Sequence, residues 1–192
     1  MKKSALSKLS SLQRKVETTL RKFTGQSDFQ RWGNMDGLSK SWDSRTIQIA
    51  KLIEPETSVI EFGAGRLVLK AALNESCSYT PSDIVNRGEG TIICDLNEEV
   101  LPLFQAYDVA VFSGVLEYIN DVPKLILHLS NYVNVILASY AVTEKNKSNR
   151  LSGGWVNDYS TNQFINVFEN SGFHCVHTEE WKSQVIFKFL KK

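Results

Sequence analysis

The stretch Ser58–Lys70, SVIEFGAGRLVLK, constrains the fold more than any other part of the sequence. Its first five residues are almost uninterrupted by polar side chains, as in a parallel strand that is covered on both faces. Gly63 and Gly65 follow, and glycine reaches backbone angles closed to other residues and lets the chain pass close to a ligand. A strand that enters a helix through such a turn is typical of sites for the phosphates or ribose of a nucleotide-like ligand. Because Val68 takes the place of a third glycine, the dinucleotide pattern is incomplete.

Strands and helices alternate along the chain beyond this turn and before it. Such alternation predicts an α/β fold with a doubly wound, mostly parallel sheet that is covered by helices on both faces. The last two strands are joined by a link too short for a parallel crossover, so they should form an antiparallel hairpin. The seven predicted strands are Ser58–Phe62, Ser78–Ile84, Thr91–Cys94, Asp108–Ser113, Asn134–Tyr140, Phe173–Glu179 and Gln184–Leu190, and the predicted helices are Thr46–Ile53, Arg66–Leu73, Val100–Phe104, Val122–Tyr132 and Thr161–Ser171.

The connection between the second and third predicted strands is unusually short. Only seven residues, IVNRGEG, run from Ile84 to Gly90, whereas a parallel crossover usually needs about a dozen or more. Either the usual crossing helix is reduced to a loop, or the third strand is misplaced.

Length and composition indicate one domain with an extension. A chain of 192 residues with 42% hydrophobic residues supports one sizeable core, and we divide it into a helical extension, 1–41, and a domain, 42–192. Its three cysteines, Cys77, Cys94 and Cys175, are too scattered for a disulfide framework or a zinc site. No run approaches the apolar length of a membrane span, so we expect a soluble, cytoplasmic protein. We expect no metal either, because the three histidines are scattered.

The first 25 residues form a basic arm. They hold seven basic residues against Glu17 alone, a net charge of +6 in a chain whose total is +1. The apolar residues of the arm fall along one stripe of a helix, which must be covered by something. We favour packing on this chain or on a second copy, and contact with a membrane surface or another protein remains an alternative. Nucleic acid is less favoured, because the arm lacks interleaved aromatic residues. The stripe consists of Leu6, Leu9, Leu12, Val16, Leu20 and Phe23.

Four motifs carry a resemblance to a known family. They are EFGAG at Glu61–Gly65, an acid twenty residues beyond Gly63, CDL at Cys94–Leu96, and YDVAVFSGVLEYINDV at Tyr107–Val122. In this order and spacing they resemble the motifs of class I S-adenosylmethionine-dependent methyltransferases, most closely the small-molecule branch. The resemblance covers roughly Trp42 to the C-terminus and implies S-adenosylmethionine as the cofactor.

The resemblance implies a role for each motif residue. Glu61, Gly63 and Gly65 belong to the cofactor turn, and Asp83 would accept hydrogen bonds from both ribose hydroxyls. Asp95 would meet the adenine amino group, although it could instead cap a following helix.

Two further residues are assigned to the cofactor's surroundings. Ser113 ends the fourth predicted strand, beside the expected cofactor site. Arg45 could clamp the carboxylate of the cofactor, and the alternative for this residue is an ordinary surface charge.

Catalysis by such a protein needs few side chains. A sulfonium carries an activated methyl group, so the main task is to align acceptor, methyl carbon and sulfur in a dry pocket. Tyr118 stands where the family usually has histidine, and a tyrosine of ordinary pKa is a poor base near neutrality. Glu117 is the other weak candidate. Trp155, beside Gly153 and Gly154 in the polar stretch 141–159, is either a substrate lid or part of an ordinary mobile loop.

The acceptor and two other function classes stay open at this point. A small-molecule hydroxyl or amine, such as that of a sugar, fits the resemblance, and the sequence does not choose between them. A catalytically silent methyltransferase-like subunit would carry the same cofactor motifs. An NAD-binding oxidoreductase would explain the turn and Asp83, but it would need the missing third glycine.

Overall fold

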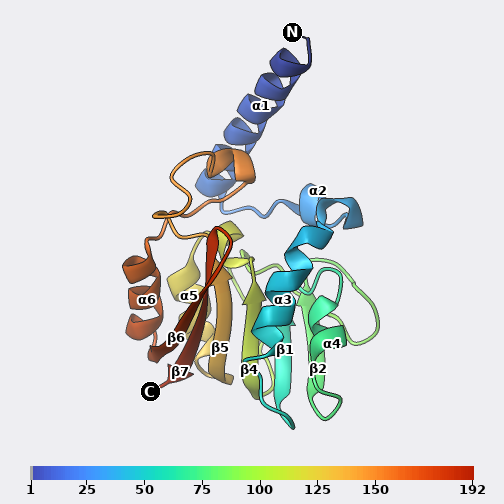
Figure 1. Cartoon of the computed structure of the whole chain (residues 1–192), viewed down its shortest axis with the longest axis vertical. Coiled ribbons are helices and arrows are strands. Elements are labelled where there is room, and N and C mark those ends of the chain that lie inside the picture. The colour runs from blue at the N-terminus through green and yellow to red at the C-terminus, as the bar shows by residue number, and fades with distance from the viewer. Residues whose placement is uncertain (1) are drawn as a thin grey trace.

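A seven-stranded sheet forms the centre of the computed structural model, which describes residues 2–192, with side chains from Ser10 onward. The strand order is β3-β2-β1-β4-β5-β7-β6, and every neighbouring pair is parallel except the two that involve β7. The predicted fold and its antiparallel C-terminal hairpin are therefore confirmed (Figure 1). The strands are β1 (Ser58–Phe62), β2 (Ser78–Asp83), β3 (Ile92–Ile93), β4 (Tyr107–Ser113), β5 (Val133–Tyr140), β6 (Phe173–Trp181) and β7 (Gln184–Lys191).

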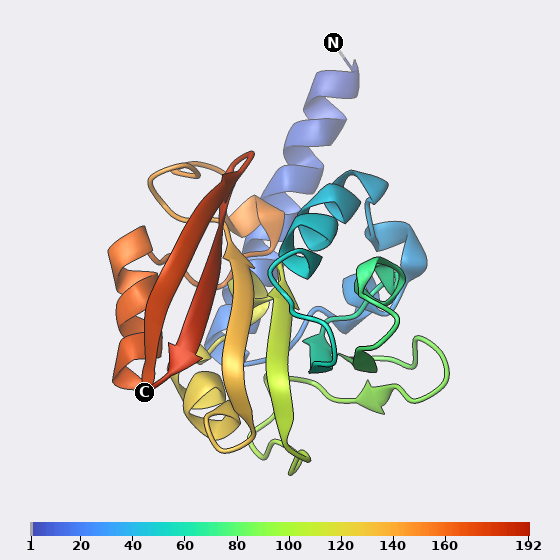
Figure 2. The same cartoon turned by 60° about the horizontal axis from the view of Figure 1, so that its bottom comes forward.

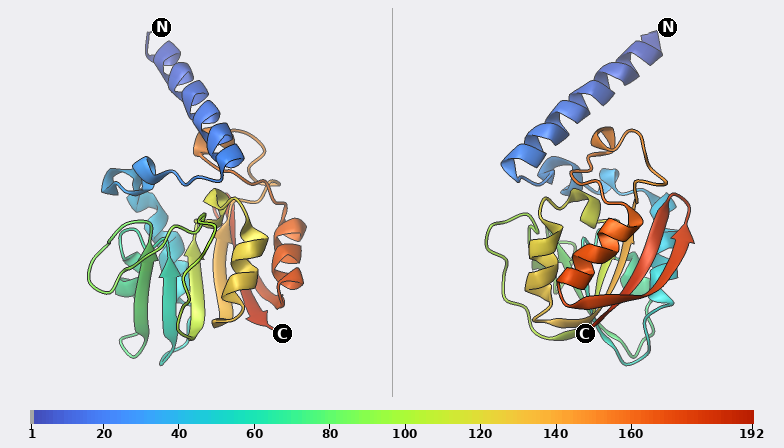
Figure 3. Two further views of the ribbon diagram at one scale, coloured as in Figure 1. Left: turned by 180° about the vertical axis from the view of Figure 1, so that it is seen from behind. Right: turned by 90° about the vertical axis from the view of Figure 1, so that its left-hand side faces the viewer.

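Helices cover both faces of this sheet (Figures 1 and 2). One face carries α3 and α4, and the other carries α5 and α6 (Figure 3). The α-helices are α1 (Lys2–Thr24), α2 (Phe29–Trp32), α3 (Asp43–Ala50), α4 (Val68–Ala72), α5 (Val122–Leu129) and α6 (Thr161–Asn170), and the 3-10 helices are η1 (Met35–Gly37), η2 (Lys40–Trp42), η3 (Leu116–Tyr118) and η4 (Leu151–Gly153).

Local sequence explains where the later helices begin. Asp121 precedes α5, and its side chain accepts a hydrogen bond from the backbone N–H of Lys124. Ser160 precedes α6 and exchanges hydrogen bonds with Gln163 in a capping box. Both caps satisfy N–H groups that the first turn of a helix leaves without an intrahelical partner.

The larger part of the core lies between the sheet and the pair α5 and α6. Aromatic rings of α6 meet those of β7 there, and all of them are fully buried. Phe168 and Phe189 stack with ring centroids 3.8 Å apart and planes within 3°. Phe164 fills the space between Phe187 and the ring of Tyr140, with which it stacks at 4.4 Å. These contacts fix the position of β7 between β5 and β6.

The predicted helix around Val100–Phe104 is wrong. Residues 95–106 contain no helix, because Pro102 has no backbone N–H to continue one. Leu101 and Phe104 are buried while Leu103 is exposed, so the segment crosses the edge of the core in an irregular conformation.

The structure also resolves the crossover after β2 and shifts the start of the helix after the glycine turn. The connection 84–91 is a loop without a helix, so the first of the two alternatives for this crossover is correct. The helix after the glycine turn begins at Val68 rather than Arg66, because Leu67 adopts a left-handed conformation with φ of 57°.

The α1 helix contacts the body through its polar side. Thr18 is buried where α1 meets η4, and Arg21 forms an ion pair with Asp28 at 3.0 Å. The apolar residues Leu12 and Phe23 are exposed instead. The expectation that the stripe packs on this chain is therefore wrong for its described part.

Replacement of Phe168 by alanine should cost about 3–5 kcal/mol of unfolding free energy, because it leaves a cavity in the stacked aromatic core. Phe23→Ala is the matched control and should change stability by less than about 0.5 kcal/mol, because Phe23 is 90% exposed. Urea unfolding measures both values. Equal losses in the two variants would contradict this description of the core.

Candidate functional site

One cavity of about 220 Å³ opens above the carboxyl ends of β1, β2 and β4. Ligands of open α/β sheets bind at this edge, next to the point between β1 and β4 where the strand order reverses. Ten residues assigned to the site from sequence all line this cavity: Arg45, Glu61, Gly63, Gly65, Asp83, Asp95, Ser113, Glu117, Tyr118 and Trp155. The structure thus brings them together, while the role of each remains a prediction.

The glycine turn is tied to the end of β2 by three backbone donors. The N–H groups of Gly63 and Ala64 donate to the carbonyl oxygen of Ser82 at 2.8 and 3.1 Å. The N–H of Gly65 donates to Oδ2 of Asp83 at 2.8 Å. Gly63 and Gly65 both have positive φ, 70° and 49°, so the turn needs glycine at these positions.

Asp83 lies buried at the end of β2 and meets an arginine that sequence reasoning missed. Oδ1 of Asp83 and Nη2 of Arg87 are 3.1 Å apart. The same guanidinium donates to the carbonyl oxygen of Trp32 in α2. Arg87 therefore connects the end of β2 to the segment ahead of α3, and no motif in the sequence marks it.

Asp95 fastens the segment that follows α1. Its Oδ1 accepts hydrogen bonds from the Ser27 hydroxyl at 2.6 Å and from the backbone N–H of Asn97 at 2.9 Å. The Asn97 side chain in turn donates to Ser27 and to the carbonyl oxygen of Tyr118. This network closes one side of the cavity. Asp95 does not cap a helix, since none follows it.

Glu61 is a buried carboxyl at the base of the cavity. The Tyr79 hydroxyl donates to its Oε2 at 2.5 Å. Burial raises the pKa of Glu61 to about 8, although the Tyr79 hydrogen bond opposes the shift. Glu61 is therefore largely neutral at pH 7.

Arg45 of α3 reaches across the carboxyl end of β4. Its Nε and Nη2 donate to the hydroxyl and the carbonyl oxygen of Ser113 at 3.1 and 2.7 Å. Nη1 donates to Oε1 of Gln184 at 2.9 Å. Burial lowers the pKa of Arg45, and the nearby carboxyl of Glu117 opposes this. Arg45 is buried, so it is not the ordinary surface charge that was the alternative.

Glu117 presents a carboxylate oxygen without a partner. Its Oε1 accepts from the N–H of Ala141 at 2.9 Å and from Nε2 of Gln184 at 3.1 Å. Oε2 is buried and has no hydrogen-bond partner among the described residues. Burial raises the pKa of Glu117. An unpaired buried oxygen is costly, which makes this atom a candidate for contact with a ligand.

Aromatic side chains surround Tyr118 at the same end of the cavity. Trp32 meets the Tyr118 ring edge-on with centroids 4.6 Å apart, and Nε1 of Trp155 donates to the Tyr118 hydroxyl at 3.1 Å. Burial raises the pKa of Tyr118 to about 12, so it remains protonated. Nε1 of Trp32 is a buried donor without a partner among the described residues.

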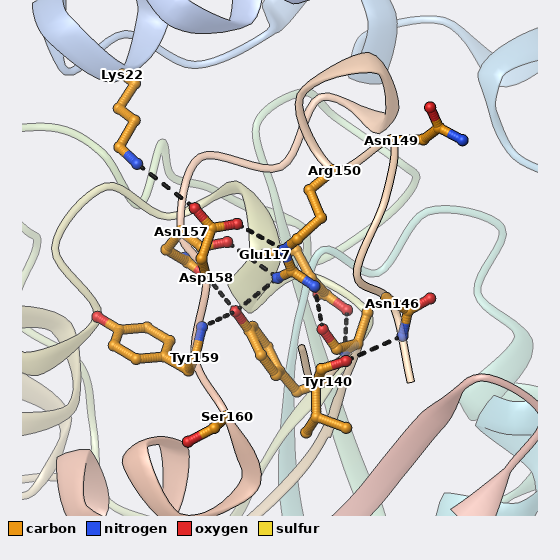
Figure 4. Close-up of polar contacts among 12 residues, drawn as sticks. Lys22, Glu117, Tyr140, Asn146, Asn149, Arg150, Asn157, Asp158, Tyr159 and Ser160 are labelled. Carbon is orange, nitrogen blue, oxygen red and sulfur yellow. Dashed lines mark hydrogen bonds and ion pairs between the residues drawn. The ribbon is translucent and has the colours of Figure 1, made fainter. Parts of the chain in front are cut away.

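The polar stretch 141–159 is held in place by one arginine (Figure 4). Arg150 is buried and donates to Asp158 and to the carbonyl oxygen of Ala141, both at 2.6 Å. It also donates to the Tyr140 hydroxyl and to the carbonyl oxygen of Asn157, at 3.1 and 3.0 Å. These bonds join the ends of the stretch beside β5 and support Trp155 over the cavity. Whether the stretch moves as a lid stays a prediction.

Part of the cavity wall lies ahead of the predicted domain. Ser27, Trp32 and Leu38 line it from the segment that follows α1. Trp32 was visible in the sequence, but its ring contacts Tyr118, which lies far from it along the chain, and no local pattern predicts this contact. Among the described residues, no group of three His, Cys, Asp or Glu could hold a metal ion.

Comparisons with known proteins agree with this geometry. A family model described as a methyltransferase domain matches residues 32–178. A protein from Nostoc punctiforme PCC 73102, assigned as an O-methyltransferase, has 14% identity and a TM-score of 0.70 over 94% of this chain and 67% of its own. Magnesium protoporphyrin IX methyltransferase from Synechocystis PCC 6803, solved with S-adenosylhomocysteine, has 16% identity and a TM-score of 0.61, over 92% of this chain and 100% of its own.

A third structure, a methyltransferase of calicheamicin biosynthesis with bound S-adenosylhomocysteine, has 14% identity and a TM-score of 0.64. The match covers 81% of this chain, which spans only 56% of that protein. A search of curated proteins gives no significant match.

The chain belongs to the methyltransferase-domain family. The prediction of a class I S-adenosylmethionine-dependent methyltransferase, similar to the small-molecule branch, is confirmed, and S-adenosylmethionine is the cofactor of this class. The NAD-binding alternative is not supported. Among the described residues, no helix has the length and apolarity to cross a membrane.

Gly63→Ala should destabilise the fold more than Gly25→Ala does. Both glycines have φ near 70°, so both substitutions force alanine into a left-handed conformation at about 1–2 kcal/mol. A Cβ on Gly63 would lie 2.5 Å from Cγ2 of Val115, whereas nothing lies within 4 Å of one on Gly25. Urea unfolding should show an additional loss of about 1–3 kcal/mol for Gly63→Ala. Equal losses would show that the turn tolerates a side chain.

Glu61→Gln should flatten the dependence of stability on pH. The pKa of Glu61 is raised from 4.5 to about 8, so the folded protein keeps a proton that the unfolded chain releases. Its contribution is fully present below about pH 4.5 and is lost as pH rises to about 8. Urea unfolding across this range should show the decline in wild type and in the exposed control Glu89→Gln, but not in Glu61→Gln. An unchanged slope in Glu61→Gln would contradict the shift.

Proposed function

We propose that this chain transfers the methyl group of S-adenosylmethionine to a hydroxyl or amine of a small molecule, such as a sugar or another metabolite. One observation carries the proposal. A single cavity joins the glycine turn and Asp83 at one end to an aromatic wall and an unpartnered carboxylate oxygen at the other. A cofactor and an acceptor can therefore share one cavity, as an in-line displacement requires.

The residues of the β1 and β2 ends would hold the cofactor. The backbone of Gly63–Gly65 approaches the cavity without side chains, and Asp83 offers its carboxylate to the ribose hydroxyls. Asp95 lies beside them for the adenine amino group. Arg45 and Ser113 lie at the end of β4, where a guanidinium suits the carboxylate of the cofactor's amino-acid portion.

The other end of the cavity would bind the acceptor. The rings of Trp32, Tyr118 and Trp155 form a wall that suits the flat face of an aromatic or sugar ring. The buried Trp32 Nε1 can donate to a polar group of that ring. Tyr118 would position the acceptor rather than deprotonate it, because its hydroxyl keeps its proton.

Glu117 is the group best suited to receive the acceptor's proton. When bound, the cofactor's sulfonium supplies the activated methyl group. A hydroxyl acceptor must lose its proton during the transfer, and Oε2 of Glu117 is free to accept it. Burial raises the pKa of this carboxyl, which strengthens it as a base. An amine acceptor could attack as its free base and would depend on Glu117 less.

We further propose a cytoplasmic location and a small-molecule partner rather than a nucleic acid. The free cysteines Cys77, Cys94 and Cys175 support a reducing compartment. The modest volume of the cavity, about 220 Å³, supports a small acceptor.

A transfer screen tests the proposed function. The full chain is incubated with S-adenosylmethionine labelled in its methyl group and with panels of sugars, nucleotide-sugars, phenols, amines and small acids. Label should appear in one chemical class of acceptor. If the protein binds the cofactor but labels no panel, the catalytically silent subunit is the better description.

Asp83→Ala should weaken S-adenosylmethionine binding by about 1–3 kcal/mol, because hydrogen bonds to a charged group are lost. Asp36→Ala is the matched control, since Asp36 lies exposed in η1, and it should leave the affinity unchanged. Isothermal calorimetry measures both. Unchanged affinity in a folded Asp83→Ala protein would remove Asp83 from the site.

Glu117→Gln should lower kcat for a hydroxyl acceptor by about 100-fold or more, because the general base is lost while the shape of the side chain is kept. Tyr118→Phe is the comparison and should raise the acceptor's KM with little change in kcat. Steady-state kinetics separate the two effects. A Glu117→Gln variant with wild-type kcat would exclude the base role.

A further inference from the structure

The α1 helix presents its apolar stripe away from the rest of the protein. Figure 3 shows α1 extending from the body, with its C-terminal part beside η4. Leu12, Val16, Leu20 and Phe23 are 60%, 54%, 58% and 90% exposed. Their spacing of four, four and three residues places them along one side of the helix.

The body contacts the opposite side of the same helix. Thr18 is buried against the body and lies two residues from Val16 and from Leu20, a rotation of about 200°. Arg21 donates a hydrogen bond to the Thr18 hydroxyl within the helix at 3.1 Å, and it links α1 to the following segment through the ion pair with Asp28. Because the polar side of α1 contacts the body, the apolar stripe on the opposite side faces solvent.

Lysines run beside the apolar stripe. Lys15 and Lys22 are seven residues apart, so they follow one flank of the helix, and Lys8 continues the same spacing in the sequence. Lys15 and Lys22 are exposed, and Lys22 forms a long ion pair with Asp158 at 3.8 Å. With Glu17 as the single acid through Gly25, the arm has a net charge of +6.

We propose that α1 lies in the surface of an anionic lipid bilayer, with its apolar stripe inserted at the boundary of headgroups and acyl chains. A stripe of Leu and Phe beside a row of lysines is the pattern of helices that lie in this interface, and the lysines would meet anionic headgroups. Pairing with α1 of a second copy would instead bring two arms of +6 together. The charge thus favours a lipid surface over a second copy.

Such docking would place the cavity near the membrane. Ser27 and Asp28 follow α1 within a few residues and line the cavity. A docked protein would therefore hold its cavity close to the lipid surface.

Vesicle co-sedimentation of the full chain tests this proposal. Phosphatidylcholine vesicles with and without phosphatidylglycerol are compared for wild type and for the double variant Leu20→Glu, Phe23→Glu. Leu103→Glu is the matched control, because Leu103 is 84% exposed but lies just before the amino end of β4. Point variants are preferred to deletion, which would also remove the Thr18 and Arg21 contacts.

Wild type and Leu103→Glu should bind the anionic vesicles and should not bind the neutral ones. The double variant should bind at least about tenfold more weakly, because burial of one Leu or Phe side chain contributes about 1.5–3 kcal/mol. Its melting temperature and cofactor affinity should be unchanged, since both replaced side chains are exposed. Absence of wild-type binding, equal binding by the double variant, or a dimer in solution that the double variant abolishes would each overturn the proposal.

Discussion

The hydrogen bond from the Gly65 N–H to the Asp83 carboxylate is the interaction on which the site depends. It joins the turn after β1 to the end of β2, and the Ser82 carbonyl adds two more bonds between the same segments. The ends of the parallel strands β1 and β2 are thereby joined by hydrogen bonds from the glycine turn to Ser82 and to the Asp83 side chain. Arg87 extends this connection to α2 through its contacts with Asp83 and Trp32, so the wall of the cavity is fixed to the same point.

Sequence predicted those parts of the molecule that local pattern determines. All seven strands lie at the positions predicted for them, and glycines and acids at family spacing marked the residues that share one cavity. The prediction failed at Val100–Phe104, where apolar spacing suggested a helix but Pro102 interrupts it. Ser27, Arg87 and Asn97 could not be found, because they act through partners that are close only in the folded chain.

The segment between α1 and α3 contributes residues to both ends of the cavity. Ser27 bonds to Asp95 on the proposed cofactor side, and Trp32 packs against Tyr118 in the proposed acceptor wall. The same segment continues directly from α1, whose polar side rests on η4 next to Trp155. The position of α1 and the shape of the acceptor end are therefore mechanically connected. This connection explains why an extension that looked separable in sequence contributes to the site.

A crystal structure of the protein with S-adenosylhomocysteine tests the central claim most directly. The ligand should occupy the cavity above β1, β2 and β4, with its ribose hydroxyls within hydrogen-bond distance of Asp83 and its amino-acid portion beside the Gly63–Gly65 turn. A ligand bound elsewhere, or one that fills the cavity without contacting Asp83, would contradict this account.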